Sequence, residues 1–144
     1  MIEFILYTKP VTKKNSSRIV RSKTGRLFLL PSKQYQAFEK EVLPTLTRIK
    51  NKYGVIDYPV NVKCTFFMQT KHNVDLTNLL NAINDAMVVS GILLDDNRDI
   101  VVGQDGSRVF CDKTNPRIEV EITKIENYEQ WKKQKKRYWR QIKH

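Results

Sequence analysis

Residues 73–99 of the chain read NVDLTNLLNAINDAMVVSGILLDDNRD, and the rest of the sequence is organised around this acidic stretch. It has one basic residue, Arg98, although the whole chain carries 26 Lys+Arg against 15 Asp+Glu. Its carboxylates belong to Asp75, Asp85, Asp95, Asp96 and Asp99. Crowded aspartates repel one another unless a cation or a proton lies between them, and Mg²⁺ and Mn²⁺ prefer such hard oxygen ligands. The stretch therefore predicts a metal site in a basic protein, a combination that suits cleavage of a phosphodiester.

A helix is predicted in the middle of this stretch. Its apolar residues recur every three or four positions, at Leu76, Leu79, Leu80, Ile83 and Met87. Gly91 ends the helix, and Asp95 and Asp96 follow in a turn. Capping of the helix by Asp75 or Thr77 is the simpler explanation for those positions. A helix of about 15 residues spans roughly 22 Å, so Asp75 and Asp96 can share a metal only if the segment after Gly91 doubles back.

The N-terminal part predicts a strand and a basic loop. Residues 2–8 are rich in β-branched and aromatic side chains, which favours a strand. Residues 9–32 have turn formers and no clear period, so we expect a long loop with a short hairpin about residues 23–25. The basic side chains of this segment that could face phosphates are Lys13, Lys14, Arg18, Arg21 and Arg26. A solvated loop is the alternative.

An amphipathic helix and a strand are predicted before the acidic stretch. The helix begins after Ser32, which can cap it, and ends at Gly54. Pro44 lies inside this helix and predicts a kink or a division into two shorter helices. Residues 58–70 alternate between apolar and polar side chains, which is typical of a strand.

Three strand-like segments follow the acidic stretch, over residues 99–103, 107–112 and 117–122. Asp105-Gly106 is a hairpin turn signal, although a bulged single strand also fits. Residues 127–143 predict a basic helix with aromatic side chains along one face. Such a helix could bind the DNA backbone, a membrane surface or a partner, or could dock by its aromatics with its lysines in solvent. Its candidate DNA contacts are Lys132, Lys136 and Arg140. Together the elements predict one α+β domain over residues 1–144.

Basic residues gather at both ends of the chain, whose formal net charge is +11. Residues 1–34 hold eight Lys/Arg and one acid, and residues 124–144 hold eight Lys/Arg and two acids. Basic ends around an acidic middle predict a polyanion lying across the protein, with generic solubility as the alternative. The chain has no long apolar run and no signal-peptide pattern, and its two cysteines are isolated. We therefore expect no membrane span and a reducing, cytoplasmic environment.

The order of a strand, Asp75-Leu76-x-Asn78, a helix, Gly91 and then Leu94-Asp95-Asp96 resembles the RusA family of Holliday junction resolvases. The resemblance covers most of the chain, from the first strand to the strand at Asn115-Pro116-Arg117. Members of this family are small, often prophage-borne, Mg²⁺-dependent homodimers that cut four-way DNA junctions. The resemblance implies a small mixed β-sheet with helices packed on it. It also implies Mg²⁺ as cofactor (with Mn²⁺ as a substitute), branched DNA as partner and a homodimer.

The resemblance assigns the aspartates by position. Asp75 matches the family's first catalytic aspartate and Asp96 its later one, and Asp95 and Asp85 match further acidic positions. It implies that Asp75, Asp95 and Asp96 are catalytic. The same three residues, together with Asp85, would bind the metal.

Two positions depart from the family's pattern of D-L-D-N followed by a lysine. Thr77 stands at the second aspartate, and Asn81 stands at the catalytic lysine. Asp95, Asp99 or Asp105 could supply the missing carboxylate. The missing cation could come from Lys13, Lys14 or Lys113. The departures favour a rival interpretation, a non-catalytic, structure-specific DNA-binding protein on the same fold.

Other substrates also remain open. A nuclease for flaps, replication forks or RNA fits the sequence as well. A basic scaffold protein is the last alternative, and it leaves the acidic stretch without an explanation.

Overall fold

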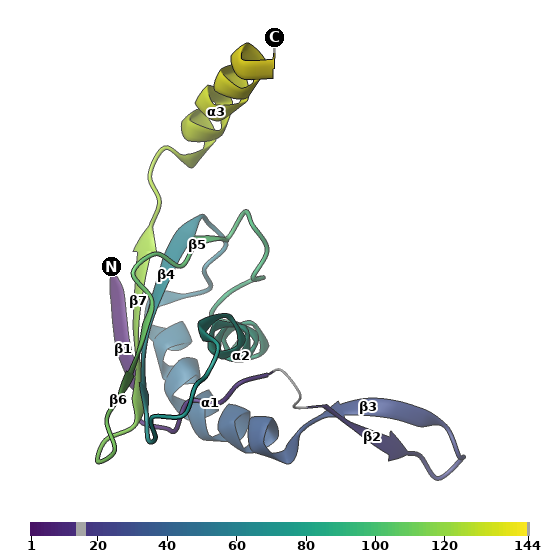
Figure 1. Cartoon of the computed structure of the whole chain (residues 1–144). Helices are drawn as coiled ribbons and strands as arrows, with labels where there is room; N and C mark the ends of the chain where they lie inside the picture. The colour runs from purple at the N-terminus through teal and green to yellow at the C-terminus, as the bar shows by residue number, and fades with distance from the viewer. Residues whose placement is uncertain (14–16, 144) are drawn as a thin grey trace.

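The computed structural model describes residues 1–13 and 17–143, and its centre is a mixed β-sheet with two helices on one face (Figure 1). The strands of this sheet are β1 (Ile2–Leu6), β4 (Val60–Met68), β5 (Val101–Gly103), β6 (Arg108–Cys111) and β7 (Arg117–Lys124). Strand β7 lies between β1 and β4 and is antiparallel to both. Strands β5 and β6 run parallel to β4 along its other edge. The predicted α+β class and the mixed sheet are confirmed.

The alternation of apolar residues determines which face of the sheet is covered. In β4, Val60, Val62, Cys64 and Phe66 are fully buried, and their neighbours in the strand are partly exposed. Strands β1 and β7 show the same alternation, so their buried residues join one core under the helices. The strand predicted over residues 58–70 is therefore confirmed, with ends two residues shorter on each side.

Helix α1 (Lys33–Tyr53) is one continuous helix with Pro44 inside it, so of the two predicted outcomes, a kink or two shorter helices, the second is wrong. Ser32 caps it as predicted, because its Oγ accepts a hydrogen bond from the Tyr35 backbone N–H at 3.1 Å. Pro44 lies on the exposed side of the helix. The carbonyl that Pro44 leaves without an intrahelical donor can therefore be hydrated, which makes proline tolerable there.

Helix α2 (Leu76–Ser90) crosses the same face of the sheet beside α1 (Figure 1). Gly91 ends it in the left-handed conformation, with φ of 84°. The chain then turns back as the sequence analysis required. Ile92 and Leu93 are buried, and the Leu93 N–H donates to the Met87 carbonyl at 3.3 Å. Leu93 also forms a parallel bridge with Ile56, which anchors the returning segment to the loop before β4.

The hairpin predicted at Asp105-Gly106 is wrong, and the bulged-strand alternative describes the structure. Strands β5 and β6 both pair with β4, not with each other, and residues 104–107 form a bulge between them. The Asn61 side chain holds this bulge, since its Oδ1 accepts from the Asp105 N–H at 2.9 Å and its Nδ2 donates to the Asp105 carbonyl at 3.2 Å. Gly106 supplies the positive φ of 87° that the bulge needs.

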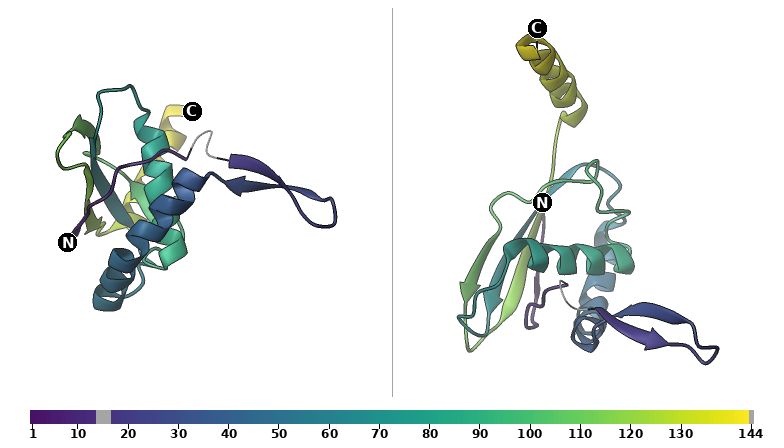
Figure 2. Two further views of the ribbon diagram at one scale, coloured as in Figure 1. Left: turned by 90° about the horizontal axis from the view of Figure 1, so that it is seen from below. Right: turned by 45° about the vertical axis from the view of Figure 1, so that its right-hand side comes forward.

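Two elements project from this body on different sides (Figure 2). One is a hairpin of β2 (Ser17–Arg21) and β3 (Leu27–Pro31), which replaces most of the predicted long loop. The predicted turn about residues 23–25 is confirmed, with the Ser22 N–H donating to the Arg26 carbonyl at 2.8 Å. The other is the basic helix α3 (Tyr128–Lys143), as predicted. Among the described helices, none is long and apolar enough to cross a membrane.

Candidate functional site

Asp75 lies at the start of α2, but its carboxylate does not cap the helix. Its backbone has the extended conformation of an N-cap residue, with φ of −81° and ψ of 123°, and no side-chain cap hydrogen bond is formed. Instead its Oδ2 accepts a hydrogen bond from the Asn78 side-chain amide at 3.1 Å. Capping therefore does not account for the carboxylate of Asp75, which is exposed at the surface.

Asp95 organises the turn that follows the returning segment. Its Oδ1 accepts from the Asp96 N–H at 2.7 Å, and its Oδ2 accepts from the Asn97 side chain at 3.1 Å. The Asn97 Oδ1 in turn accepts from the Asp99 N–H at 2.9 Å. This local network fixes the backbone from which the neighbouring Asp96 carboxylate is presented.

The carboxyls of Asp96 and Asp85 interact electrostatically, although 11 residues separate them in the sequence. Partial withdrawal from water raises the pKa of Asp96, and the negative charge of Asp85 and a hydrogen bond with Asp95 raise it further. The doubled-back segment therefore brings Asp96 towards the middle of α2. Asp75 is ten residues before Asp85 on the helix, about 15 Å away at 1.5 Å per residue.

Lys13 reaches this centre from the N-terminal segment. Its Nζ forms an ion pair with the Asp85 carboxylate, and its backbone N–H donates to the Asn78 carbonyl at 3.4 Å. Its Nζ also lies 5.7 Å from the centre of the Tyr35 ring. Lys13 is thus held against α2 at two points, and its positive charge lies beside Asp85.

Tyr35 and Asn84, which no sequence motif singles out, also lie beside this centre. Tyr35 is buried, and its pKa is raised by burial and then by the charges of Glu39 and Asp85. Asn84, also buried, exchanges two hydrogen bonds with the Gln104 side chain, at 3.2 and 3.4 Å. That pair ties α2 to the bulge. In the sequence, the one signal for Asn84 was an amide side chain among the apolar residues of the buried face of α2.

The four predicted metal ligands are not gathered at one point. Within residues 1–13 and 17–143, no three His, Cys, Asp or Glu side chains are grouped closely enough to hold a metal ion. In the structure the charge of Asp85 acts on the Asp96 carboxyl, Asp95 lies beside Asp96, and Asp75 stands apart at the start of α2. Mg²⁺ is commonly held by one or two carboxylates, with waters and substrate phosphates completing the shell. The oxygen donors of this centre therefore fit the ion.

The predicted DNA-contacting residues occupy the two projecting elements and the segment between the body and the hairpin. Arg21 and Arg26 are exposed on the hairpin, while Lys132, Lys136 and Arg140 lie on α3. Lys132 pairs with Glu129 at 2.9 Å and with Asp99 at 3.7 Å. Lys14 and the side chain of Arg18 lie outside the described part of the structure.

The chain matches the family described as Endodeoxyribonuclease RusA over residues 8–123 of its 144. No curated protein matches the chain significantly. A match over this share of the sequence, with the mixed sheet and the acidic centre described above, places the protein among the DNA endonucleases. The chain belongs to the RusA family of endodeoxyribonucleases, hydrolases that act on Holliday junctions and generally depend on a divalent metal. Helix α3 lies beyond the matched residues.

Proposed function

We propose that this protein resolves four-way DNA junctions by paired, Mg²⁺-dependent hydrolysis of phosphodiesters and works as a homodimer. The observation that carries the proposal is that Asp85 on α2 pairs with Lys13 and that its charge also acts on Asp96, in the turn after Gly91. A two-fold homodimer would present two such centres to the two strands that must be cut.

Asp96, Asp95 and Asp85 are the proposed ligands at the folded-back end of the site, and Asp75 is the proposed ligand at the start of α2. The raised pKa of Asp96 supports the first group, because partial withdrawal from water and then the charge of Asp85 raise it, and a bound cation would offset both. Asp75, at the family's first catalytic position, has a carboxylate that is not used for capping. Asp75, Asp95 and Asp96 are the proposed catalytic residues.

Bound Mg²⁺ would lower the pKa of a coordinated water and offset negative charge on the phosphate. The protein's own residues set up that chemistry. The Asp95 turn holds the Asp96 carboxylate in place, and the Asn84–Gln104 pair holds the middle of α2. We infer that the Lys13 ammonium, held beside Asp85, supplies the cation that Asn81 does not provide at the family's lysine position.

Binding of branched DNA is assigned to the two projecting elements, the β2–β3 hairpin and α3. Arg21 and Arg26 on the hairpin and Lys132, Lys136 and Arg140 on α3 would contact phosphates on either side of the centre. Lys14 and Arg18 belong to the same proposal through their place in the basic N-terminal segment. Contacts of this kind read the shape of the junction more than its base sequence.

Cleavage of a labelled four-way junction with Mg²⁺ or Mn²⁺ tests the proposal, with a linear duplex beside it. The wild type should make paired nicks in the junction, and Asp75→Asn and Asp96→Asn should each bind the junction and lose cleavage by about 10²-fold or more, the scale of removing a charge-stabilising group. Asp57→Asn, at an exposed aspartate in the loop before β4, is the matched control and should cut normally.

A non-catalytic junction-binding protein is the second candidate, and the Thr77 and Asn81 departures favour it. Tight junction binding by the wild type with no cutting in either metal would establish this candidate and reject the catalytic proposal. Cutting of flaps or forks in preference to four-way junctions would instead keep the nuclease and change its substrate.

A further inference from the structure

Helix α3 presents aromatic side chains to solvent. Trp131, Tyr138, Trp139 and Ile142 are each 52–57% exposed, at spacings that place them along one side of the helix. A cluster of exposed large apolar side chains commonly marks a binding surface. Since α3 lies beyond residues 8–123, the family match does not account for this surface.

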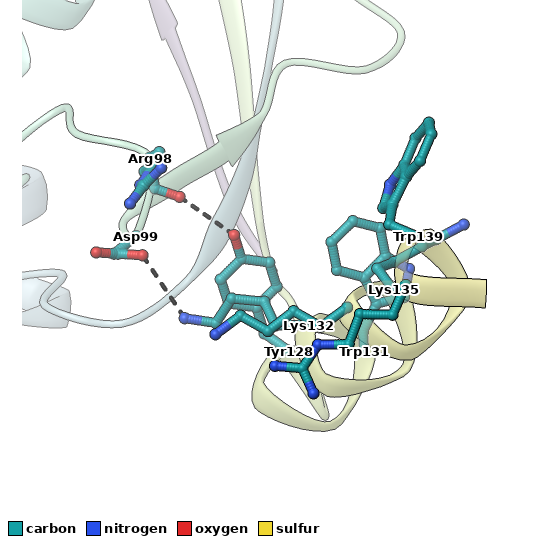
Figure 3. A pocket seen from close by; sticks show the side chains of 9 residues that line it. Arg98, Asp99, Tyr128, Trp131, Lys132, Lys135 and Trp139 are labelled. Carbon is teal, nitrogen blue, oxygen red and sulfur yellow. Dashed lines mark hydrogen bonds and ion pairs between the residues drawn. The ribbon is translucent and has the colours of Figure 1, made fainter. Parts of the chain in front are cut away.

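The aromatic rings of α3 alternate with lysine ammonium groups (Figure 3). Tyr128 and Trp131 stack with ring centres 6.0 Å apart and planes inclined by 15°. The Lys132 Nζ lies 4.9 Å from the centre of the Tyr128 ring, and the Lys135 Nζ lies 5.7 Å from that of Trp131. The same side of the helix therefore offers flat π faces and positive charges in alternation.

A cleft of about 620 Å³ lies between this side of α3 and the turn at Arg98 and Asp99. Two contacts join its walls: the Tyr128 hydroxyl donates to the Arg98 carbonyl at 3.4 Å, and the Lys132 Nζ lies 3.7 Å from Asp99 Oδ1. The volume falls within the roughly 300–1,000 Å³ that small-ligand sites occupy. Because Arg98 follows Asp96 by two residues, the cleft adjoins the acidic turn of the proposed catalytic centre.

The charge of α3 identifies the kind of occupant. Its sequence holds seven Lys/Arg and one acid, a net +6, and subtracting this from the +11 of the chain leaves +5 on the rest. A second copy of the helix or of the body is also positive and is therefore a poor occupant of this cleft. A membrane surface would favour a helix whose cations and aromatics lie on opposite faces, whereas Lys132 and Lys135 lie over the rings themselves.

We propose that α3 and the Arg98–Asp99 turn form a groove that binds unpaired nucleotides of single-stranded DNA. Trp131 and Trp139 stack against the bases, and Lys135 and Arg140 contact the phosphates on the same side of the helix. The inference rests on the proposed function for the source of the strand, which is the opened branch point beside the acidic turn. Duplex DNA hides the faces of its bases, so the groove discriminates for unpaired strands.

The chain has two tryptophans, and both are in α3, so intrinsic tryptophan fluorescence reports on this groove alone. An oligothymidylate titrated into the full-length protein should quench this emission, because a stacked base contacts the indole ring. Two control ligands should quench the emission much less: a duplex of equal length, and heparin, a polyanion without bases. The comparison is made at matched occupancy, and fluorescence polarisation of labelled ligands would measure that occupancy.

Matched variants separate stacking from charge. Trp131→Ala with Trp139→Ala should weaken oligothymidylate binding by about tenfold or more, since each stacked base is worth roughly 1–3 kcal/mol. Tyr53→Ala is the control, because Tyr53 is another exposed aromatic with a lysine Nζ 5.0 Å from its ring centre, on α1. It should bind like the wild type, and circular dichroism should show that all variants keep their helices.

Three results would each overturn this inference. The first is unchanged oligothymidylate binding by the double tryptophan variant, and the second is quenching by heparin equal to that by the oligonucleotide. The third is an emission change that depends on protein concentration, or on added phosphatidylserine vesicles, and not on the oligonucleotide. Failure of the resolvase proposal is distinguishable, because quenching does not require cleavage. The tryptophan emission of the Asp75→Asn variant should be quenched by oligothymidylate as that of the wild type is, even if neither protein cuts a junction.

Discussion

At the scale of single residues, Asp96 is where the environment of the site can be measured directly. Its raised pKa means that its carboxyl stays protonated at a higher pH than an ordinary aspartate, so metal binding should be lost at a correspondingly higher pH as the pH falls. Asp85→Asn removes one negative charge and should lower the pKa of Asp96. Carboxyl NMR titration would measure it, with Asp57→Asn as a control that leaves it unchanged. An unaltered Asp96 pKa in the Asp85 variant would contradict the geometry.

The raised pKa of Asp96 also makes the stability of the folded protein depend on pH, in a direction that can be stated. Because the folded-state pKa of Asp96 is raised, the folded protein binds this proton more tightly than the unfolded chain. The Asp96 contribution therefore disfavours the folded state above the folded pKa and is relieved as the pH falls through it. Adding Mg²⁺ should lower the apparent pKa of Asp96 if the ion binds there, because the ion favours the carboxylate.

The aspartates themselves could be chosen from the sequence, but their partners could not. The chain doubles back after Gly91, as a shared site requires, yet the charge that acts on Asp96 is that of Asp85, in the middle of α2 and about 15 Å along the helix from Asp75. The position that Asp96 reaches depends on the bridge between Leu93 and Ile56, which are 37 residues apart in the sequence. No local pattern encodes such a contact.

At the scale of elements, Gly91 links the end of α2 to the position of the acidic turn. Its φ of +84° is costly for any residue with a Cβ, whereas the 2.8 Å approach of an added Cβ to the Lys50 Nζ can be relieved by a shift of that flexible side chain. Gly91→Ala should therefore lower the free energy of unfolding by roughly 1–2 kcal/mol. It should also reduce junction cleavage by displacing Asp95 and Asp96. Chemical denaturation and the cleavage assay would measure the two effects.

Gly25→Ala provides the comparison for Gly91→Ala. Gly25 has nearly the same φ, +86°, but lies at the tip of the β2–β3 hairpin with nothing within 4 Å of an added Cβ. Gly25→Ala should therefore strain the hairpin and leave junction cleavage unchanged, because the aspartates lie on the body of the protein. If Gly91→Ala cut junctions as well as Gly25→Ala does, the turn after α2 would not be what positions the aspartates.

Elements with one buried face were predictable, and elements whose pairing is long-range were not. The alternation in β4 and the spacing in α1 follow from burial of one side, so the sequence shows them. The hairpin strands bury neither face: Ile19 and Leu29 are 72% and 69% exposed, so no period of two is imposed. Asp105-Gly106 supplies the same backbone bend to a bulge as to a hairpin, and the distant Asn61 selects the bulge.

At the scale of the whole molecule, the two basic projections are the features that suit an extended, branched polyanion. The hairpin and α3 leave the body on different sides, with the acidic centre on the body from which both project (Figure 2). A single duplex end could engage one projection alone, whereas DNA arms that diverge from a branch point can engage both. The number of phosphate contacts on each projection is therefore the quantity that distinguishes these cases.

The salt dependence of junction binding counts those contacts, because each neutralised phosphate adds about 0.9 to the slope of log K against log salt for duplex arms. Arg21→Gln with Arg26→Gln, and separately Lys136→Gln with Arg140→Gln, should each reduce that slope by about 2 if one copy binds and by about 4 if a homodimer binds. Arg48→Gln with Lys52→Gln, at exposed positions of α1, removes the same charge away from the projections and should leave the slope nearly unchanged. Equal losses in all three double variants would show that net charge alone binds the junction, and would reject the assignment of its arms to the hairpin and α3.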